Sequence, residues 1–146
     1  YHEDEEWVPR ILLSGGTLSF SDNVFYGYRT DREGSITKTL NIKRIYDKLF
    51  ITDHLQNIFS GSDEETRQSI MYRCCSLLFG ILCQMKEYKH FKEYNKMASA
   101  VKEQIPLLKK SAKKIHRIAY YGIKIAGFNC MMNFLYFISR KQREQK

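Results

Sequence analysis

The sequence is poor in the two residues that most often interrupt helices, with 2 prolines and 8 glycines in 146 residues. Proline removes a backbone donor and glycine costs conformational entropy, so their scarcity favours long helices. Hydrophobic residues make up 43% of the chain and aromatic residues 14%. This composition excludes an intrinsically disordered chain and is typical of one domain, or slightly more, with a buried core.

The four cysteines lack the spacing of a metal site. Cys74 and Cys75 are adjacent, Cys83 and Cys130 stand alone in apolar stretches, and no Cys-x-x-Cys pair occurs. Zinc sites and disulfide frameworks need regularly spaced ligands or partners. We therefore expect reduced thiols in the core of a cytosolic protein, without zinc and without disulfides.

Negative charge is scarce in the second half of the chain. Residues 1–84 contain 9 Lys and Arg against 12 Asp and Glu, whereas residues 85–146 contain 15 against 4. A half this basic is attracted to an anionic partner, such as a phospholipid surface, a pyrophosphate-linked lipid or nucleic acid. Nucleic acid is the poorest of the three, because the lysines from Lys86 to Lys102 follow helical spacing and no nucleic-acid-binding motif accompanies them.

Apolar residues at three-to-four spacing predict four helices, over residues 36–59, 62–86, 91–105 and 111–140. Ser62 and Glu65 form a capping box at the start of the second, and Pro106 ends or kinks the third. The mostly apolar part of the last helix, Ile118 to Ile138, approaches the roughly 20 residues that cross a bilayer. Since Lys124 lies inside it, we expect no crossing, but a core helix, a helix on a membrane surface, or one that does both.

Residues 1–35 have a different character. Asp4 to Glu6 are acidic and Gly15-Gly16 follow an apolar stretch, which predicts a short helix between them. Pro9 belongs in the first turn of such a helix, so we expect the helix to begin near Glu5 to Val8. Thr17 to Arg29 alternate partly between polar and apolar residues, which predicts two short strands.

The predicted fold class is therefore mainly α. A short α/β remnant, with one helix and two short strands, precedes an irregular bundle of about four helices.

Three segments together resemble a known family. They are His2-Glu3-Asp4-Glu5-Glu6-Trp7, Phe25-Tyr26-Gly27-Tyr28-Arg29 and Gly34-Ser35-Ile36-Thr37. In this order they resemble the C-terminal part of a family-2 nucleotide-sugar glycosyltransferase, whose fold is of the glycosyltransferase A type. In that family a Glu-Asp pair opens a helix beneath the acceptor site, and its Asp is the catalytic base of an inverting transfer. The resemblance covers residues 1–37, about a quarter of the chain.

The resemblance implies roles for particular residues. Asp4 matches the catalytic base and Glu3 its neighbour, while Tyr28, Arg29 and Ser35 match positions that flank the acceptor site. A carboxylate that removes the proton from a weakly nucleophilic sugar hydroxyl accelerates transfer about 10²–10⁴-fold. The alternative explanation of the acidic pair is simple stabilisation of a helix start by negative charge.

The donor-binding half of such an enzyme has no counterpart in this sequence. There is no Asp-x-Asp motif to hold Mg²⁺ or Mn²⁺ on a nucleotide diphosphate, and no βαβ unit for the nucleoside. The chain begins with Tyr1, so we expect a fragment that is inactive alone, with the divalent metal bound upstream in the parent. Residues 1–37 would be the C-terminal edge of the catalytic domain and residues 38–146 a helical C-terminal domain.

The parent enzyme would move a sugar from a nucleotide-sugar to a hydroxyl of a saccharide or lipid-linked glycan in polysaccharide biosynthesis. It would be cytoplasmic, with its basic helices peripheral at the inner face of the cell membrane. The alternative is a non-enzymatic basic helical module that binds a membrane surface or a protein partner through residues 85–146. Apolar surface left bare by a missing upstream half would also promote a homo-oligomer.

Overall fold

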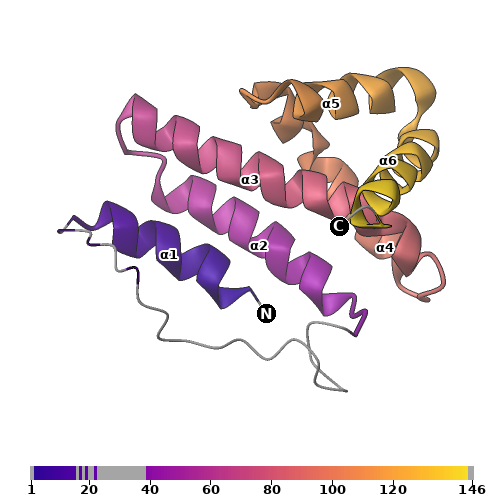
Figure 1. Ribbon diagram of the computed structural model, residues 1–146, viewed down its shortest axis with the longest axis horizontal. Helices are drawn as coiled ribbons and strands as arrows, with labels where there is room; N and C mark the ends of the chain where they lie inside the picture. Colours follow the sequence, from indigo (N-terminus) through magenta and orange to yellow (C-terminus); the bar gives the residue numbers. More distant parts are fainter. Residues whose placement is uncertain (1, 16, 18, 20–21, 23–38, 145–146) are drawn as a thin grey trace.

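The computed structural model describes residues 2–15, 17, 19, 22 and 39–144. Figure 1 shows a helical protein in which α2 and α3 lie side by side along the middle of the molecule. The described elements are α1 (Glu3–Leu13), α2 (Lys43–Ile58), α3 (Glu64–Gln84), the 3₁₀ helix η1 (Met85–Tyr88), α4 (Tyr94–Gln104), the 3₁₀ helix η2 (Ile105–Lys110), α5 (Lys114–Ala126) and α6 (Phe128–Glu144).

The predicted helical bundle is confirmed, but the α/β part of the predicted fold class is wrong. The described residues form helices and contain no strand. Most of Thr17 to Arg29, where the two short strands were expected, lies outside the described residues, as does the proposed domain boundary after residue 37. Long apolar stretches with few prolines and glycines favour helices, and helices alone form the elements of the described residues.

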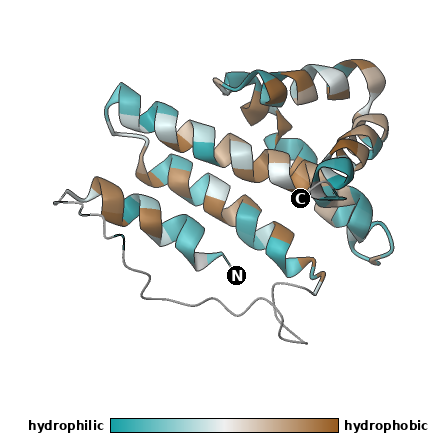
Figure 2. Cartoon of the chain, viewed as in Figure 1, coloured by the Kyte–Doolittle hydropathy of each residue, from teal (hydrophilic) through white to brown (hydrophobic). Residues whose placement is uncertain are grey.

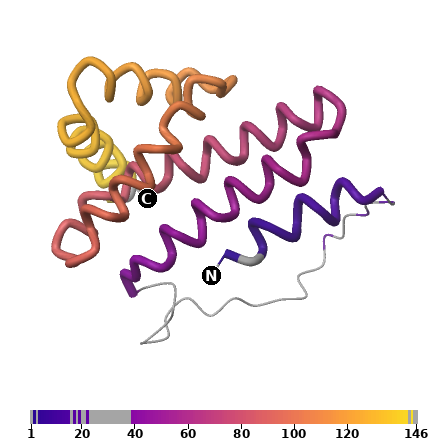
Figure 3. Tube along the Cα trace, turned by 180° about the vertical axis from the view of Figure 1, so that it is seen from behind, coloured from indigo at the N-terminus to yellow at the C-terminus, as the bar shows by residue number. Residues whose placement is uncertain are grey.

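The helices form two groups on either side of α3. α1 packs against α2, and α2 packs against α3. On the other side of α3 lie η2, α5 and α6, as the two opposite views in Figures 1 and 3 both show. α1 therefore lies far from α5, and the two groups are joined by α3 and by α4, which packs against both α2 and η2.

The core is built around α3, which contributes side chains to both groups. Cys74, Cys75 and Leu78 are buried on its middle turns, and Figure 2 shows the apolar and polar residues alternating along the helices. The largest fully buried side chains come from α2, α3, η1, α4, η2 and α6: Ile45, Leu55, Leu78, Ile81, Leu82, Met85, Tyr88, Met97, Leu108 and Met132. Burial of such side chains stabilises each by about 1.5–3 kcal/mol relative to exposure.

Two predicted helix starts are wrong. α3 is capped by Asp63 rather than Ser62: the Asp63 carboxylate accepts a hydrogen bond of 2.9 Å from the Thr66 N–H. α1 begins at Glu3, so Pro9 lies inside the helix and not in its first turn. An interior proline removes one helical hydrogen bond. α1 tolerates this because side-chain contacts with α2 and α3 hold it in place.

The long helix predicted over residues 111–140 is also wrong, because the structure divides it into α5 and α6. Gly127 separates them with φ 84° and ψ 159°, a conformation available essentially only to glycine. Its N–H donates to the Ile123 carbonyl and ends α5. Among the described residues, no helix is both long enough and apolar enough to cross a bilayer.

Candidate functional site: a groove beside the first helix

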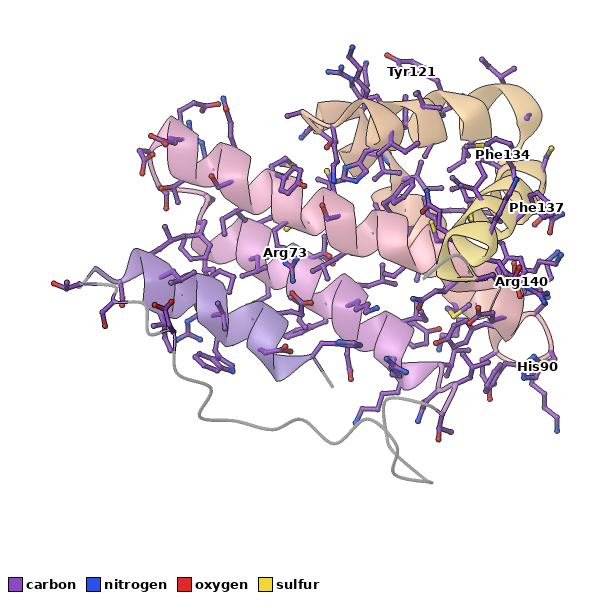
Figure 4. All side chains as sticks on the ribbon, in the orientation of Figure 1. Arg73, His90, Tyr121, Phe134, Phe137 and Arg140 are labelled. Atoms are coloured by element: carbon purple, nitrogen blue, oxygen red, sulfur yellow. The ribbon has the colours of Figure 1, made fainter. Side chains whose placement is uncertain are left out.

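α1 is held to the rest of the protein by two of its acidic residues. Glu5 forms an ion pair with Arg73 of α3, which Figure 4 labels in the middle of the molecule. Glu6 Oε1 lies 3.2 Å from His54 Nε2 on α2 and 3.0 Å from Arg10 Nη1 on its own helix. The Arg10 hydrogen bond lowers the pKa of Glu6 and keeps it ionised. Successive acids in one turn thus face different neighbouring helices.

The apolar side chains of α1 are poorly covered. Trp7 is 46% exposed, and its neighbours on the helix are similarly exposed: Val8, Ile11, Leu12 and Leu13. A helix that packs with its apolar face uncovered marks a surface that meets another protein, a ligand or a membrane. This face borders the two grooves described next.

A groove of about 450 Å³ lies between α1 and α3. Asp4 stands in the first turn of α1 at this groove, with an exposed side chain. The ion pair of Glu5 and Arg73 lies beside it, and the walls are mostly apolar. The other lining residues are Val8, Pro9, Leu12, Leu13, Ser69 and Ile70. A carboxylate at the rim of an apolar groove of this size resembles the arrangement of small-molecule sites, which occupy roughly 300–1,000 Å³.

A second groove, of about 480 Å³, lies at the other end of α1. Arg10, Ser14 and His54 contribute its polar side chains. The apolar ones are Leu13, Ile58 and Phe59. Arg10 and His54 are both engaged by Glu6. The residues that line the second groove include no Asp or Glu, so it offers no carboxylate for proton abstraction.

His2 precedes α1 with a left-handed backbone conformation, φ 63° and ψ 31°. Burial, together with the nearby cations Lys48 and Arg44, lowers the pKa of His2, whereas Asp4 opposes this shift. His2 is therefore neutral at physiological pH. Its buried Nε2 has no hydrogen-bond partner among the described atoms.

The structure places only part of the predicted site. Asp4 lines the groove, and Glu3 is the first residue of α1. Tyr28, Arg29 and Ser35 lie outside the described residues. Arg73 was not predicted, because no sequence pattern links it to Glu5 across 68 positions.

The described residues contain no cluster of three or more His, Cys, Asp or Glu side chains with the geometry of a metal site. Comparison with known proteins finds no matching family model, no matching curated protein and no matching solved structure.

Proposed function

We propose that this chain is the acceptor-side, C-terminal part of an inverting glycosyltransferase in which Asp4 is the general base. The observation that carries the proposal is the position of Asp4, in the first turn of a helix and at the rim of a groove. The resemblance of residues 1–37 to family-2 glycosyltransferases expects the base in the same place. Arg73 and Glu5 support the geometry, because their ion pair fixes the start of α1 against α3.

The chemistry needs one base and no covalent nucleophile. Asp4 accepts the proton of an acceptor hydroxyl as the hydroxyl oxygen attacks the anomeric carbon of the donor sugar. The bond from that carbon to the nucleoside diphosphate breaks, and the diphosphate leaves with the bonding electrons. A single displacement inverts the anomeric configuration. Proton removal by a positioned carboxylate accounts for about 10²–10⁴-fold of the rate.

The other parts of the proposal follow from the resemblance. The donor nucleotide and its Mg²⁺ or Mn²⁺ would be held by residues upstream of this chain. The acceptor would be a saccharide or a lipid-linked glycan at the cytoplasmic face of the cell membrane. Arg73 would be a positioning residue, since it acts through Glu5 rather than on the sugar.

Product stereochemistry tests the reaction class. The whole protein that contains this chain would be incubated with α-linked UDP- and GDP-sugars, Mn²⁺ and a membrane extract as acceptor. Release of the nucleoside diphosphate would identify the donor, and proton NMR of the product would give its anomeric configuration. We expect a β-linked product. An α-linked product, or no release with any donor, would contradict an inverting transferase.

A further inference from the structure

The outward sides of α5 and α6 carry large apolar side chains that no part of the described protein covers. Ile118 and Ile125 are 56% and 88% exposed on one face of α5, and Phe137 is 69% exposed on α6. Figure 4 labels Tyr121 on the outer edge of α5, and Phe134 and Phe137 beside α6. We name this surface the α5–α6 face; its exposed apolar members are Ile115, Ile118, Tyr121, Ile125, Phe134, Phe137 and Ile138.

Positive charge borders these side chains. Arg117 and Lys124 are seven positions apart, so they form a row next to the row of Ile118 and Ile125 on the same helix. Between Glu103 and Glu144 every charged residue is Lys or Arg. The cations in this stretch are Lys109, Lys110, Lys113, Lys114, Arg117, Lys124, Arg140, Lys141 and Arg143.

The α5–α6 face is part of a folded scaffold. On the inner side of α5, His116 and Ala119 are buried, and the Ser111 hydroxyl lies 2.7 Å from His116 Nδ1. On the inner side of α6, Met132 and Leu135 are buried. Each helix therefore has one face in the core and one face in solvent. The exposed side chains are available for binding without unfolding either helix.

We propose that the α5–α6 face binds the surface of a bilayer that contains anionic phospholipid, with its apolar side chains in the interface and its cations at the headgroups. Apolar residues bordered by Lys and Arg are typical of helices that lie in this plane. This proposal goes beyond the glycosyltransferase proposal and does not depend on Asp4.

Charge complementarity favours an anionic bilayer over a second copy of the chain or a polynucleotide as the partner of this face. A second copy that docked through the same face would bring like charges together, because Glu144, already paired with Arg140, is the only carboxylate from residue 104 to residue 144 of the sequence. A polynucleotide would neutralise the cations but would leave isoleucines such as Ile118 and Ile125 uncovered. An anionic bilayer satisfies both kinds of side chain.

The position of the face also keeps the candidate groove clear of the bilayer. α5 and α6 lie on the opposite side of α3 from α1 (Figures 1 and 3). Asp4 would thus face the cytosol while the α5–α6 face meets the headgroups.

Vesicle co-sedimentation of the full chain tests the proposal. The probes are vesicles of phosphatidylcholine alone and of phosphatidylcholine mixed with phosphatidylserine, at low and at physiological salt. We expect binding to the mixed vesicles that weakens with salt, and much weaker binding to phosphatidylcholine alone. Equal binding to both vesicle types, or no binding to the mixed vesicles at low salt, would overturn the proposal.

Paired variants with matched controls locate the surface. Arg117→Gln with Lys124→Gln should lower the partition coefficient about 25-fold, at about fivefold for each cation. Ile118→Ser with Ile125→Ser should lower it about tenfold or more. The controls are Lys92→Gln with Lys96→Gln, and Phe50→Ser on α2, where Phe50 is 65% exposed. Controls that lose as much binding as the paired variants would overturn the assignment of the face.

Fluorescence gives an independent readout of insertion. Trp7 is the single tryptophan of the chain and lies on α1. In a Trp7→Phe background, Phe137→Trp should show blue-shifted emission when mixed vesicles are added, whereas Trp7 in the unchanged protein should not shift. A shift of Trp7 without a shift at position 137 would place the membrane on α1 instead. If the protein did not bind vesicles, was a dimer in solution and became a monomer on Ile125→Ser, the α5–α6 face would be a dimer interface, and the membrane proposal would be overturned.

Discussion

Replacing Gly127 with alanine is the sharpest test of the architecture. Gly127 has φ 84° and ψ 159°, a backbone region that costs an L-residue about 1–3 kcal/mol. A Cβ at this position would meet no atom within 4 Å. The expected loss in the free energy of unfolding is therefore about 1–3 kcal/mol, and it comes from backbone strain alone.

Gly80→Ala is the matched control for this substitution. Gly80 lies inside α3, does not have a positive φ, and would also gain a Cβ with no neighbour within 4 Å. Alanine in a helix interior should raise the free energy of unfolding by about 0.5–1 kcal/mol. The same chemical change is thus expected to have opposite signs at the two positions.

Equilibrium unfolding in urea, followed by far-ultraviolet circular dichroism, measures both variants. One continuous helix over residues 111–140 and two helices separated at Gly127 predict opposite signs for the change in the free energy of unfolding. If residues 111–140 formed one continuous helix, Gly127→Ala would stabilise the protein as Gly80→Ala does. Stabilisation at Gly127 would therefore refute the break between α5 and α6, and with it the geometry of the α5–α6 face.

Three further predictions concern single side chains. Burial, with a smaller effect of Lys113, lowers the pKa of His116 below its ordinary 6.5. The contribution of neutral His116 to the free energy of unfolding should therefore be complete above pH 6.5 and should fall as the pH drops below it. Urea titrations across that range should show a weaker pH dependence for His116→Gln. Asp63→Ala should cost about 1 kcal/mol in the same assay through loss of the α3 cap, whereas Ser62→Ala should change little, and the reverse order would mean that the cap is misassigned. Exposed Cys130 should react quickly with a thiol reagent, whereas Cys74, buried and with its pKa raised to about 12, should react only on unfolding; equal rates would contradict the described core.

Helical periodicity was enough to predict most of the helices. Leu49 of α2 and Leu78 of α3, which the three-to-four spacing selects, are buried, whereas Phe50, which the same spacing selects, is 65% exposed. Gly127 escaped prediction because glycine inside an apolar helical pattern is compatible with a helix interior or a helix end, and only the backbone dihedral distinguishes them. Asp63 and Ser62 are both good caps, so sequence leaves the helix start uncertain by one residue.

The candidate site was less accessible to sequence reasoning. The resemblance picked out Asp4, and the groove beside it depends on how α1 lies against α3. That placement depends on the ion pair of Arg73 and Glu5. The sequence around either residue contains no pattern that predicts this pairing. Long-range pairs of surface charges follow from the tertiary arrangement, so they are found only once the helices are placed.

The central claim is that Asp4 removes the proton of the acceptor. Its most direct measurement compares the kcat of Asp4→Asn and Glu6→Gln in the whole protein that contains this chain. Glu6 is the matched control, because it lies in the same turn region and contacts His54 and Arg10 on the other side of α1. We predict that Asp4→Asn lowers kcat about 10²–10⁴-fold with the KM for the donor little changed, while Glu6→Gln keeps most of its activity. An Asp4→Asn enzyme that is folded and transfers sugar at the original rate would contradict the claim.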